Sequence, residues 1–272
     1  MSTTESIKPH VLVFGGNGRV AKAMTKIMVS RLWQVTSVVR NIMQKQNILR
    51  LGGYNPSTNL DVLECDLANI RTSKDASSII EMVQPNIVVF AAGSFTNPYE
   101  IDRDAAQRIA QAAARADFVR KFLIISFPAS RRQPAPWWNR QDVKDYMQES
   151  NAYPSIKEAK LQADEYAIAL ARQRELRGGP SFQVISVRPS WLRTSAPTGK
   201  VRLGKTQAVG QVTIGDVADV AVSMLSRDDT HGWFDLLQGE EGIKEAVEAV
   251  VRDKINSIEG EDLERMYKLA MA

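Results

Sequence analysis

Short runs of apolar residues, many of them β-branched, recur along the first two-thirds of the chain. They show no in-and-out alternation of apolar and polar positions, and they occupy residues 10–15, 34–40, 60–65, 86–92, 121–126 and 182–188. Continuous apolar runs of this length are typical of parallel strands covered on both faces. The pattern therefore predicts a buried parallel sheet.

Between these runs, apolar residues recur every three or four positions, as in amphipathic helices. The predicted helices cover residues 20–32, 75–84, 102–117 and 155–176. A repeated strand–helix order implies right-handed crossovers between parallel strands. We therefore expect an α/β fold with a doubly wound, Rossmann-like parallel sheet and helices on both faces.

The last third of the chain is less regular. Residues 191–207 are rich in Gly, Pro, Thr and Lys, which favours a loop or a short hairpin. The remaining pattern predicts a helix at 214–226, a strand at 232–239 and terminal helices at 240–253 and 261–270. No repeat or linker divides the chain, so we expect one domain over 1–272, with 191–207 and 229–272 forming a smaller C-terminal lobe on the substrate side.

Charge and chemistry exclude several classes of function. The net charge is only +4 and the basic residues are scattered, so the sequence does not indicate nucleic-acid binding. Cys65 is the only cysteine, which excludes an internal disulfide, and no group of His, Cys and Asp has metal-ligand spacing. We expect no metal.

The N-terminal stretch MSTTESIKPH is polar and has no apolar signal core. No apolar run in the sequence is long enough to span a bilayer. We therefore expect a cytoplasmic protein with no membrane partner.

The first predicted strand runs directly into a glycine-rich turn and then into a helix. From Gly16 to Ala21 the turn has the pattern Gly-x-Gly-x-x-Ala, a dinucleotide-binding fingerprint in its required context. Glycines let backbone N–H groups approach a pyrophosphate, and the helix N-terminus favours negative charge. The alternative is a turn in which glycine serves packing alone. We expect cofactor binding by Gly15, Gly16, Asn17, Gly18, Arg19 and Val20.

The end of the second predicted strand indicates which dinucleotide is bound. NAD-binding units usually place an acid there for the ribose hydroxyls, whereas this strand ends in Arg40. Together with Arg19 in the turn, Arg40 can form charge-assisted hydrogen bonds to a 2′-phosphate. The alternative is that both arginines face solvent. The sequence favours NADP(H) as the cofactor.

Eight motifs in order along the chain resemble a known family, the atypical short-chain dehydrogenase/reductases. The closest resemblance is to the NmrA-like NAD(P)-binding proteins common in filamentous fungi. It rests on GGNGRVA, VVRN, CDL, FAAG, IISFPASRR, YPSIKEAKLQADEY, SVRPSWL and TIGDVADVA, which together extend over almost the whole chain.

The resemblance implies further cofactor contacts. Asp66 and Leu67 would lie near the adenine, and Ala91, Ala92 and Gly93 beside its ribose. At the nicotinamide end it implies Ser126, Phe127, Pro189 and Ser190, with Lys157 on the nicotinamide ribose. Apart from Lys157, these residues lie at or just after the ends of predicted strands, in line with the rule that ligands bind outside the carboxyl ends of parallel strands.

Tyr153 and Lys157 match the family's Y-x-x-x-K pattern. In that pattern a phenol donates a proton to a carbonyl and a neighbouring ammonium lowers the phenol pKa. Two departures stand against a complete Ser–Tyr–Lys set. Pro154 moves Tyr153 away from helical geometry, and Phe127–Pro128 occupy the expected position of the serine. Tyr153 is therefore either a proton donor or a cap and pocket-lining residue.

Arg131 follows the fifth strand and is a candidate to stabilise an oxyanion where the serine is missing. The alternative is an arginine pair on the surface, with Arg132. Trp137, Trp138 and Trp191 lie on segments that the fold would bring to the open face of the cofactor, and at most one of the two adjacent tryptophans can face a pocket. Aromatic walls there suit a flat or apolar small molecule.

These features favour an NADP(H)-dependent oxidoreductase that acts on a small, apolar carbonyl or imine. Tyr153 would be the proton donor, Lys157 the ribose anchor and Arg131 the oxyanion support. Two alternatives stay open, an NAD(P)-binding regulatory protein without turnover and a non-redox biosynthetic cyclase. The C-terminal helices are compatible with either a homodimer face or a cover over the pocket.

Overall fold

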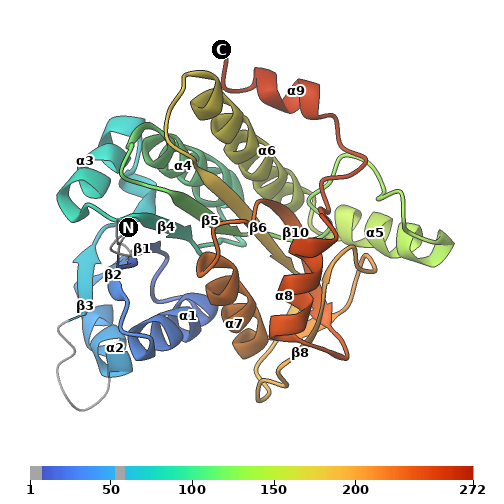
Figure 1. Ribbon diagram of the computed structural model, residues 1–272, viewed down its shortest axis with the longest axis horizontal. Coiled ribbons are helices and arrows are strands. Elements are labelled where there is room, and N and C mark those ends of the chain that lie inside the picture. Colours follow the sequence, from blue (N-terminus) through green and yellow to red (C-terminus); the bar gives the residue numbers. More distant parts are fainter. Residues whose placement is uncertain (1–7, 53–58, 272) are drawn as a thin grey trace, which may run out of the picture.

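The computed structural model describes residues 8–52 and 59–271. Of the polar N-terminal stretch, residues 1–7 lie outside the described part. Within the described part, the strands form one large central sheet with the order β11-β8-β10-β6-β5-β4-β1-β2-β3 and a small second sheet, β7-β9 (Figure 1). The strands are β1 His10–Phe14, β2 Gln34–Val39, β3 Leu60–Glu64, β4 Ile87–Phe90, β5 Lys121–Ile125, β6 Gln183–Pro189, β7 Trp191–Arg193, β8 Lys200–Gly204, β9 Gln211–Thr213, β10 Gly232–Gln238 and β11 Glu241–Gly242.

The neighbours from β3 to β10 are all parallel, and β8 and β11 add antiparallel strands at one edge. This arrangement confirms the predicted doubly wound α/β fold. Each of the six predicted apolar runs forms a strand, with ends that differ from the prediction by one or two residues. The order reverses at β1, which lies between β2 and β4, and ligands of such sheets bind at this switch point.

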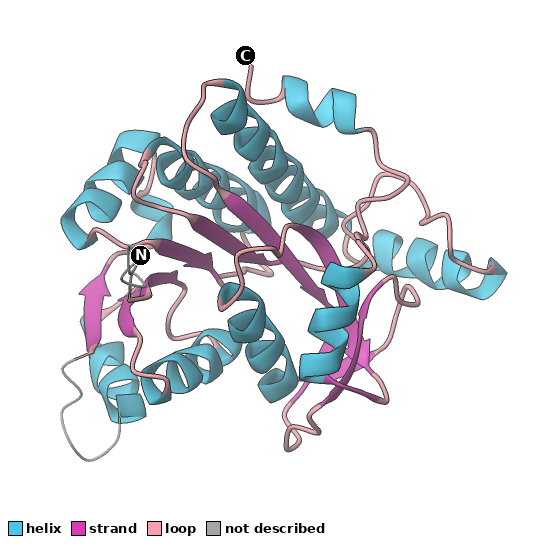
Figure 2. Ribbon diagram, viewed as in Figure 1, coloured by secondary structure: helices cyan, strands magenta, loops and turns pink. Residues whose placement is uncertain are grey.

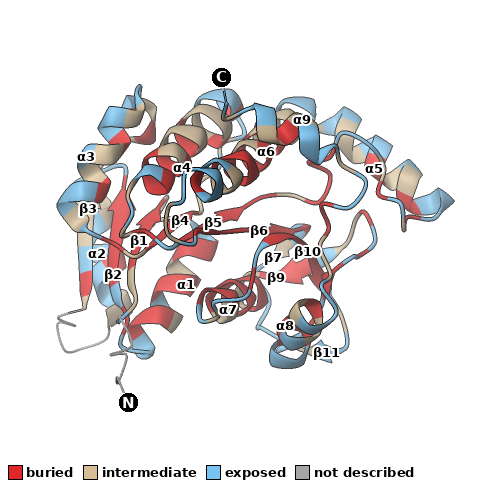
Figure 3. Cartoon of the chain, turned by 45° about the horizontal axis from the view of Figure 1, so that its top comes forward, coloured by how far each residue is buried: buried red, intermediate tan, exposed pale blue. Residues whose placement is uncertain are grey.

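Helices cover both faces of the sheet (Figures 2 and 3). Successive residues of β1 point to opposite sides: Val11 and Val13 join one buried cluster, and Leu12 and Phe14 join the other. This explains why the strands are apolar without alternation. One face carries α1 Arg19–Ser30, α7 Ile214–Leu225 and α8 Ile243–Arg252, with the short α2 Lys45–Leu49 beside α1, and the other carries α3 Ser73–Val83, α4 Ala106–Arg115, α6 Pro154–Leu176 and α9 Leu263–Lys268.

Short helical turns complete the described elements. Three are 3-10 turns, and one is a π-helical segment that leads directly into α4; they are η1 Ile42–Gln44, η2 Arg50–Gly52, η3 Leu67–Asn69 and the π-helix η4 Tyr99–Ala105. π-Helical segments are rare and occur often at functional sites. Here η4 follows β4, at the ligand-binding edge of the sheet.

The segments expected to form a smaller lobe join the central sheet instead. β8 lies within residues 191–207, and β10 and β11 lie within 229–272; all three belong to the nine-stranded sheet. They extend that sheet on the side of β6 because β10 pairs with both β6 and β8. Residues 191–207 do not form a hairpin with themselves, since β7 pairs with β9.

Helix α5, Arg140–Ala152, was not predicted from the apolar pattern. Its start carries a capping box, in which Asn139 accepts hydrogen bonds from the Gln141 and Asp142 N–H groups and Asp142 accepts one from Asn139. The helix has few apolar positions, so its periodicity is weak, but Asn-x-x-Asp is a recognisable start signal.

Candidate cofactor-binding and active site

The glycine turn between β1 and α1 is constrained at each glycine. Gly15 has φ +79°, a backbone conformation that residues with a side chain rarely adopt. A Cβ on Gly16 would lie 1.9 Å from the Ser37 Oγ of β2, because the Gly16 N–H donates to the Val38 carbonyl at 2.8 Å. The turn therefore brings bare backbone against the end of the sheet.

Helix α1 begins with unpaired backbone donors. No side chain caps it at Gly18, and its first turn contains no acidic residue. The first N–H groups of a helix have no partner within the helix, so they point at the space in front of it. Such an end attracts phosphate groups.

Two adjoining cavities open at this point, one of about 430 Å³ and one of about 370 Å³. Both lie at the carboxyl ends of the parallel strands. They form one cleft because four residues line both of them, namely Gly18, Ala91, Ala92 and Gly93.

The first cavity contains most of the predicted adenosine contacts, Gly15, Asn17, Arg40, Asp66 and Leu67. The Asp66 carboxylate accepts a hydrogen bond from the Ala68 N–H at 3.2 Å, which fixes the turn η3. Glu100 lines the cavity as well.

Arg40 is exposed and makes no hydrogen bond or ion pair with any other described residue. Its guanidinium is thus available to a ligand in the first cavity. Arg19 lines the second cavity and not the first. The two guanidiniums predicted to act on one phosphate therefore line different cavities.

The second cavity has aromatic and aliphatic walls. The Tyr153 ring packs edge-on against Phe95 and Trp191, with centroids 6.4 and 5.4 Å away. Ile156 and Leu192 also line this cavity. Its surface suits an apolar or planar molecule.

The predicted nicotinamide contacts Ser126, Phe127, Pro189 and Ser190 all line the second cavity. Two of these side chains are already engaged. The Ser126 hydroxyl donates to Asp164 Oδ2 at 2.6 Å, and the Ser190 Oγ accepts from the Gly210 N–H at 3.0 Å.

Tyr153 and Lys157 do not form the predicted pair. Tyr153 ends α5 and caps α6, which begins at Pro154, so its backbone is not helical. The Lys157 Nζ donates to the Tyr146 Oη at 2.9 Å and lies 4.7 Å from the centre of that ring. Lys157 lines neither cavity, whereas Tyr153 lines the second. The proline kink separates the phenol from the ammonium.

The ammonium in the cleft belongs to Lys160. It lines the second cavity, lies 2.8 Å from Asp102 Oδ1 and donates to the Ile125 carbonyl at 3.2 Å. Asp102 is buried on the π-helical segment η4, and its other oxygen accepts from the Ser94 N–H. Lys160 follows Ile156 by one helical turn, and both face the cavity. The motif pattern selected Lys157 and missed this residue.

Arg131 lies away from both cavities. It is fully buried and donates to the carbonyls of Ser257 and Glu259, with Glu261 3.5 Å from its Nε. The predicted oxyanion role for Arg131 is thus wrong in this structure, and so is the alternative of a surface pair. Arg132 is half exposed and pairs with Glu165 at 2.7 Å.

Trp137 and Trp138 are not cavity walls either. Both indole N–H groups donate to the carbonyl of Thr206, at 2.8 and 2.9 Å. They lie in a turn and not on a strand, so adjacent side chains can reach one acceptor. Of the three tryptophans expected near the cofactor, Trp191 alone lines the second cavity.

The described residues contain neither a candidate metal site nor a candidate membrane-spanning helix. In residues 8–52 and 59–271, no three His, Cys, Asp or Glu side chains are arranged to hold a metal ion. None of the helices in this part of the chain is both long and apolar enough to cross a membrane.

The fold, the glycine turn and the cleft define an NAD(P)-binding protein of the Rossmann type. The chain belongs to the NAD(P)H-binding family, whose profile matches residues 15–228. It is 24% identical over 249 residues to UPF0659 protein C216.03 of Schizosaccharomyces pombe, which covers 88% of this chain and 94% of that protein.

Two solved structures share the fold. The oxidoreductase ylbE from Lactococcus lactis has a TM-score of 0.70 at 20% identity, covering 89% of this chain and 97% of that one. A putative NAD-dependent epimerase/dehydratase from Bacillus halodurans has a TM-score of 0.67 at 24% identity, covering 89% and 99%.

The residues of the cleft fit a dinucleotide. Buried polar atoms without a partner, Asn17 Oδ1 and Gln44 Oε1, belong to residues lining the first cavity, where the ligand can satisfy them. A Cβ at Gly15 would come within 2.7 Å of Ala92, so the turn admits only bare backbone. The first cavity suits the adenosine half and the second suits the nicotinamide half.

Proposed function

We propose that the protein is an NADP(H)-dependent oxidoreductase of the atypical short-chain type, acting on a small apolar carbonyl or imine. The observation that carries this proposal is the two-part cleft. A glycine-lined half suited to the adenosine is continuous with an aromatic-walled half suited to the nicotinamide and a substrate. When bound, the cofactor supplies the hydride, and the protein supplies orientation and electrostatics.

Arg40 supports NADP(H) over NAD(H). It directly follows β2, lines the first cavity and has no side-chain partner among the described residues. A planar guanidinium matches a phosphate by forked hydrogen bonds. The Asp66 carboxylate is already held by the Ala68 N–H, so it is less available to a ribose hydroxyl.

Lys160 takes the role that the motif pattern gave to Lys157. Its ammonium reaches the second cavity beside Gly93, where it can donate to the hydroxyls of the nicotinamide ribose. Asp102 holds it in place by an ion pair that is nearly buried. Lys160 thus orients the cofactor for transfer to a ligand held by the aromatic wall.

The substrate class follows from the walls of the second cavity. Phe95, Tyr153 and Trp191 form a row of rings, and the charged side chains that line this cavity, Arg19 and Lys160, are both cationic. No carboxylate of the described residues lines it, so a cationic substrate would find no counter-charge there. A neutral or anionic molecule with a planar group next to its carbonyl fits best.

The experiment that tests the proposal is NADPH consumption with a panel of carbonyls. The panel contains benzaldehyde, cyclohexanecarboxaldehyde, hexanal and 9,10-phenanthrenequinone, with enzyme-free reactions as controls. We expect the planar members to be reduced fastest. If protein that is shown to bind NADPH consumes none with any member of the panel, the proposed oxidoreductase function is overturned.

A regulatory protein that binds NADP(H) without turnover is the second candidate. One observation favours it, namely that Tyr153 and Lys157 do not form a phenol–ammonium pair. The same panel separates the two, because a regulator binds NADPH tightly and reduces nothing.

A further inference from the structure

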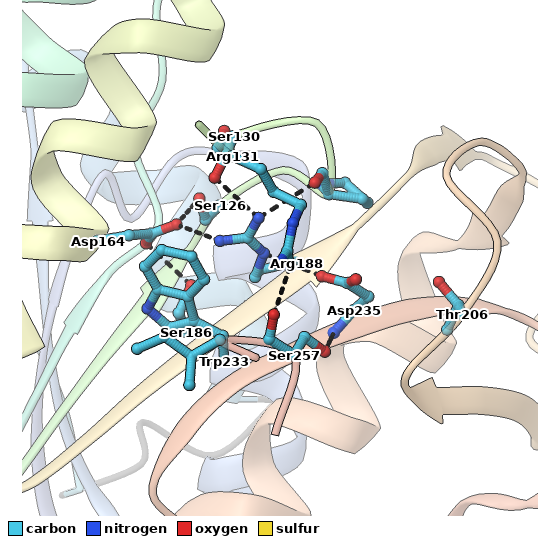
Figure 4. Close-up of polar contacts among 12 residues, drawn as sticks. Ser126, Ser130, Arg131, Asp164, Ser186, Arg188, Thr206, Trp233, Asp235 and Ser257 are labelled. Atoms are coloured by element: carbon cyan, nitrogen blue, oxygen red, sulfur yellow. Dashed lines mark hydrogen bonds and ion pairs between the residues drawn. The ribbon is translucent and has the colours of Figure 1, made fainter. Parts of the chain in front are cut away.

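A buried network of charged and hydroxyl groups adjoins the second cavity at Ser126. Figure 4 shows the contacts of this network. Asp164 of α6 is fully buried at its centre and accepts from three side chains. Its Oδ2 accepts from the Ser126 hydroxyl at 2.6 Å and from the Arg188 Nη1 at 3.0 Å, and its Oδ1 accepts from the Ser186 hydroxyl at 2.9 Å. The network reaches the ligand-binding space through Ser126, which lines the cavity.

The network continues away from the cavity along β6 and β10. Arg188 also donates from Nε to Asp235 Oδ1 at 2.9 Å, so one guanidinium serves two fully buried carboxylates. Figure 4 shows Arg188 between Asp164 and Asp235. Arg131 lies next to Arg188, and Glu261 is its acidic neighbour.

The charges in this network do not balance. Two guanidiniums, of Arg131 and Arg188, face three carboxyl groups, of Asp164, Asp235 and Glu261. The other charged groups packed nearby have partners of their own. Lys160 pairs with Asp102, and Glu165 pairs with Arg132 and Arg265. Because Glu165 has two arginine partners, each of them partly exposed, these neighbouring pairs carry one extra positive charge that offsets the sum. The excess carboxyl group is therefore confined to the fully buried part of the network, where burial favours binding of a proton.

The electrostatics agree with this count. Burial raises the pKa of Asp164, against the attraction of Arg188, and it raises the pKa of Asp235 to about 6. The pKa of Glu261 is raised for the same reason. The groups are coupled through shared arginines, so the proton belongs to the cluster as a whole.

Ser126 connects this proton to the cavity. With Asp164 ionised, the Ser126 hydrogen is held by the carboxylate and only oxygen lone pairs face a ligand. With Asp164 protonated, the carboxyl group can donate to Ser126, and the serine hydrogen is free to turn to a ligand. In this second state Ser126 can donate a proton to a ligand and receive one from Asp164.

We propose that Ser126 is the residue that transfers a proton to and from the substrate oxygen, with Asp164 as the positioning residue that supplies and takes up the proton. The proposal rests on the oxidoreductase function. A bound dihydronicotinamide would supply hydride to the carbonyl carbon and leave the negative charge on the substrate oxygen. Ser126 gives its proton to that oxygen and receives one from Asp164, which becomes a carboxylate paired with Arg188. Alcohol oxidation runs the same steps backwards.

The other hydroxyl groups of the cavity lack such a connection. Among the described residues, the hydroxyl groups that line the second cavity belong to Ser126, Tyr153 and Ser190, so the other two are those of Tyr153 and Ser190. Tyr153 has no ammonium within hydrogen-bond distance in this part of the chain, because Lys157 bonds Tyr146 and Lys160 bonds Ile125 and Asp102. Ser190 accepts from the Gly210 backbone and contacts no carboxyl group there.

The chain offers a matched control. Ser126 and Ser186 each donate one hydrogen bond to Asp164, but Ser186 is fully buried and does not line the cavity. The experiment compares S126A, S186A and Y153F with the wild type. It measures NADPH reduction of the carbonyl panel from pH 5 to 9, and NADPH dissociation constants by calorimetry.

We expect S126A to lower kcat by about a hundredfold or more, the usual effect of removing a general acid, with the NADPH Kd changed by less than about twofold. We expect S186A and Y153F each to lower kcat far less than S126A does. The wild-type rate of carbonyl reduction should fall as pH rises through the titration of the cluster, and this dependence should vanish in S126A.

Three results would overturn the proposal. Equal losses in S126A and S186A would show that both serines only support Asp164. A loss in Y153F as large as that expected for S126A would make the phenol the donor. A wild type that binds NADPH and reduces no member of the panel would overturn the proposed oxidoreductase function, and the proposed proton transfer with it.

Discussion

The two halves of the cleft are built in different ways. The first cavity is formed by the glycine turn between β1 and α1 and by segments at the ends of β2, β3 and β4. The second is formed by side chains from segments far apart in the chain, such as Phe95, Tyr153 and Trp191. We expect the first half to bind the dinucleotide and the second to select the substrate. Substitutions should therefore affect the two halves separately.

The largest effect should come from Gly16→Val. Its Cβ would lie 1.9 Å from the Ser37 Oγ and 3.1 Å from the Val38 carbonyl, so the turn must move. We expect NADPH affinity to fall by at least about a hundredfold and stability by about 1–3 kcal/mol. Calorimetry and urea unfolding measure the two effects.

Gly178→Ala is the control for that substitution. Gly178 also has a positive φ, of +71°, but a Cβ there has no atom within 4 Å. It should cost about 1 kcal/mol of stability through backbone strain and leave NADPH affinity unchanged. An equal loss of NADPH affinity in both variants would contradict a specific role for the turn.

The pH dependence of stability should report the buried charges under the second cavity. The pKa of Asp235 is raised to about 6 in the folded state, above its unfolded value, so the folded state binds this proton more tightly. The resulting stability is fully present below the unfolded pKa and is lost as pH rises through about 6. Its size is about 2–3 kcal/mol.

Urea unfolding at pH 4 and pH 7 checks this sign. The free energy of unfolding of the wild type should be lower at pH 7 than at pH 4 because of this loss. The difference should be smaller in Asp235→Asn. Asp229→Asn is the control, because that carboxylate is exposed and its pKa is lowered by Arg227. An equal difference in stability between pH 4 and pH 7 in the wild type and in Asp235→Asn would show that Asp235 is ionised at both pH values.

A smaller effect separates the two lysines of α6. We expect Lys160→Met to weaken NADPH binding about tenfold and Lys157→Met by less than twofold. Lys160→Met also leaves the buried Asp102 without its ion pair, which should cost about 3 kcal/mol.

Adding Asp102→Asn to Lys160→Met should restore stability but not affinity. This double variant separates folding from binding. Unchanged NADPH affinity in the Lys160 variants would show that Lys160 does not contribute to cofactor binding.

The smallest effect should fall on the second cavity alone. Trp191→Ala removes one ring of the row beside Tyr153, and we expect the KM of a planar carbonyl to rise several-fold with the NADPH Kd unchanged. Trp137→Phe is the control, since Trp137 lies outside the cavity. A similar change in both variants would mean that loss of an indole acts through stability.

The contrast also explains what could be predicted from the sequence. The strands and the glycine turn were predictable because they depend on local patterns, and Gly16, Gly18 and Arg40 lie where the fingerprint implies. Lys160 was not, because the face that a helical residue presents depends on where its helix begins. The kink at Tyr153–Pro154 sets that start.

Long-range contacts account for the other differences. Arg131 follows a strand end that points to the cleft, but the carbonyl it binds belongs to Ser257, 126 residues away. Asp102 and Lys160 meet across 58 positions of sequence through a π-helical segment that no local pattern indicated. The Asn139–Asp142 capping box was the one visible signal, for α5, that could have been used.

The most direct test of the account is a calorimetric titration with NADPH and with NADH, on the wild type and on Arg40→Ala. We expect the wild type to bind NADPH more tightly than NADH, and Arg40→Ala to lose roughly ten- to hundredfold in NADPH affinity with little change for NADH. Equal binding of the two nucleotides, unchanged by the substitution, would contradict the assignment of Arg40 and of NADP(H). Binding of neither would mean that the glycine turn serves packing alone.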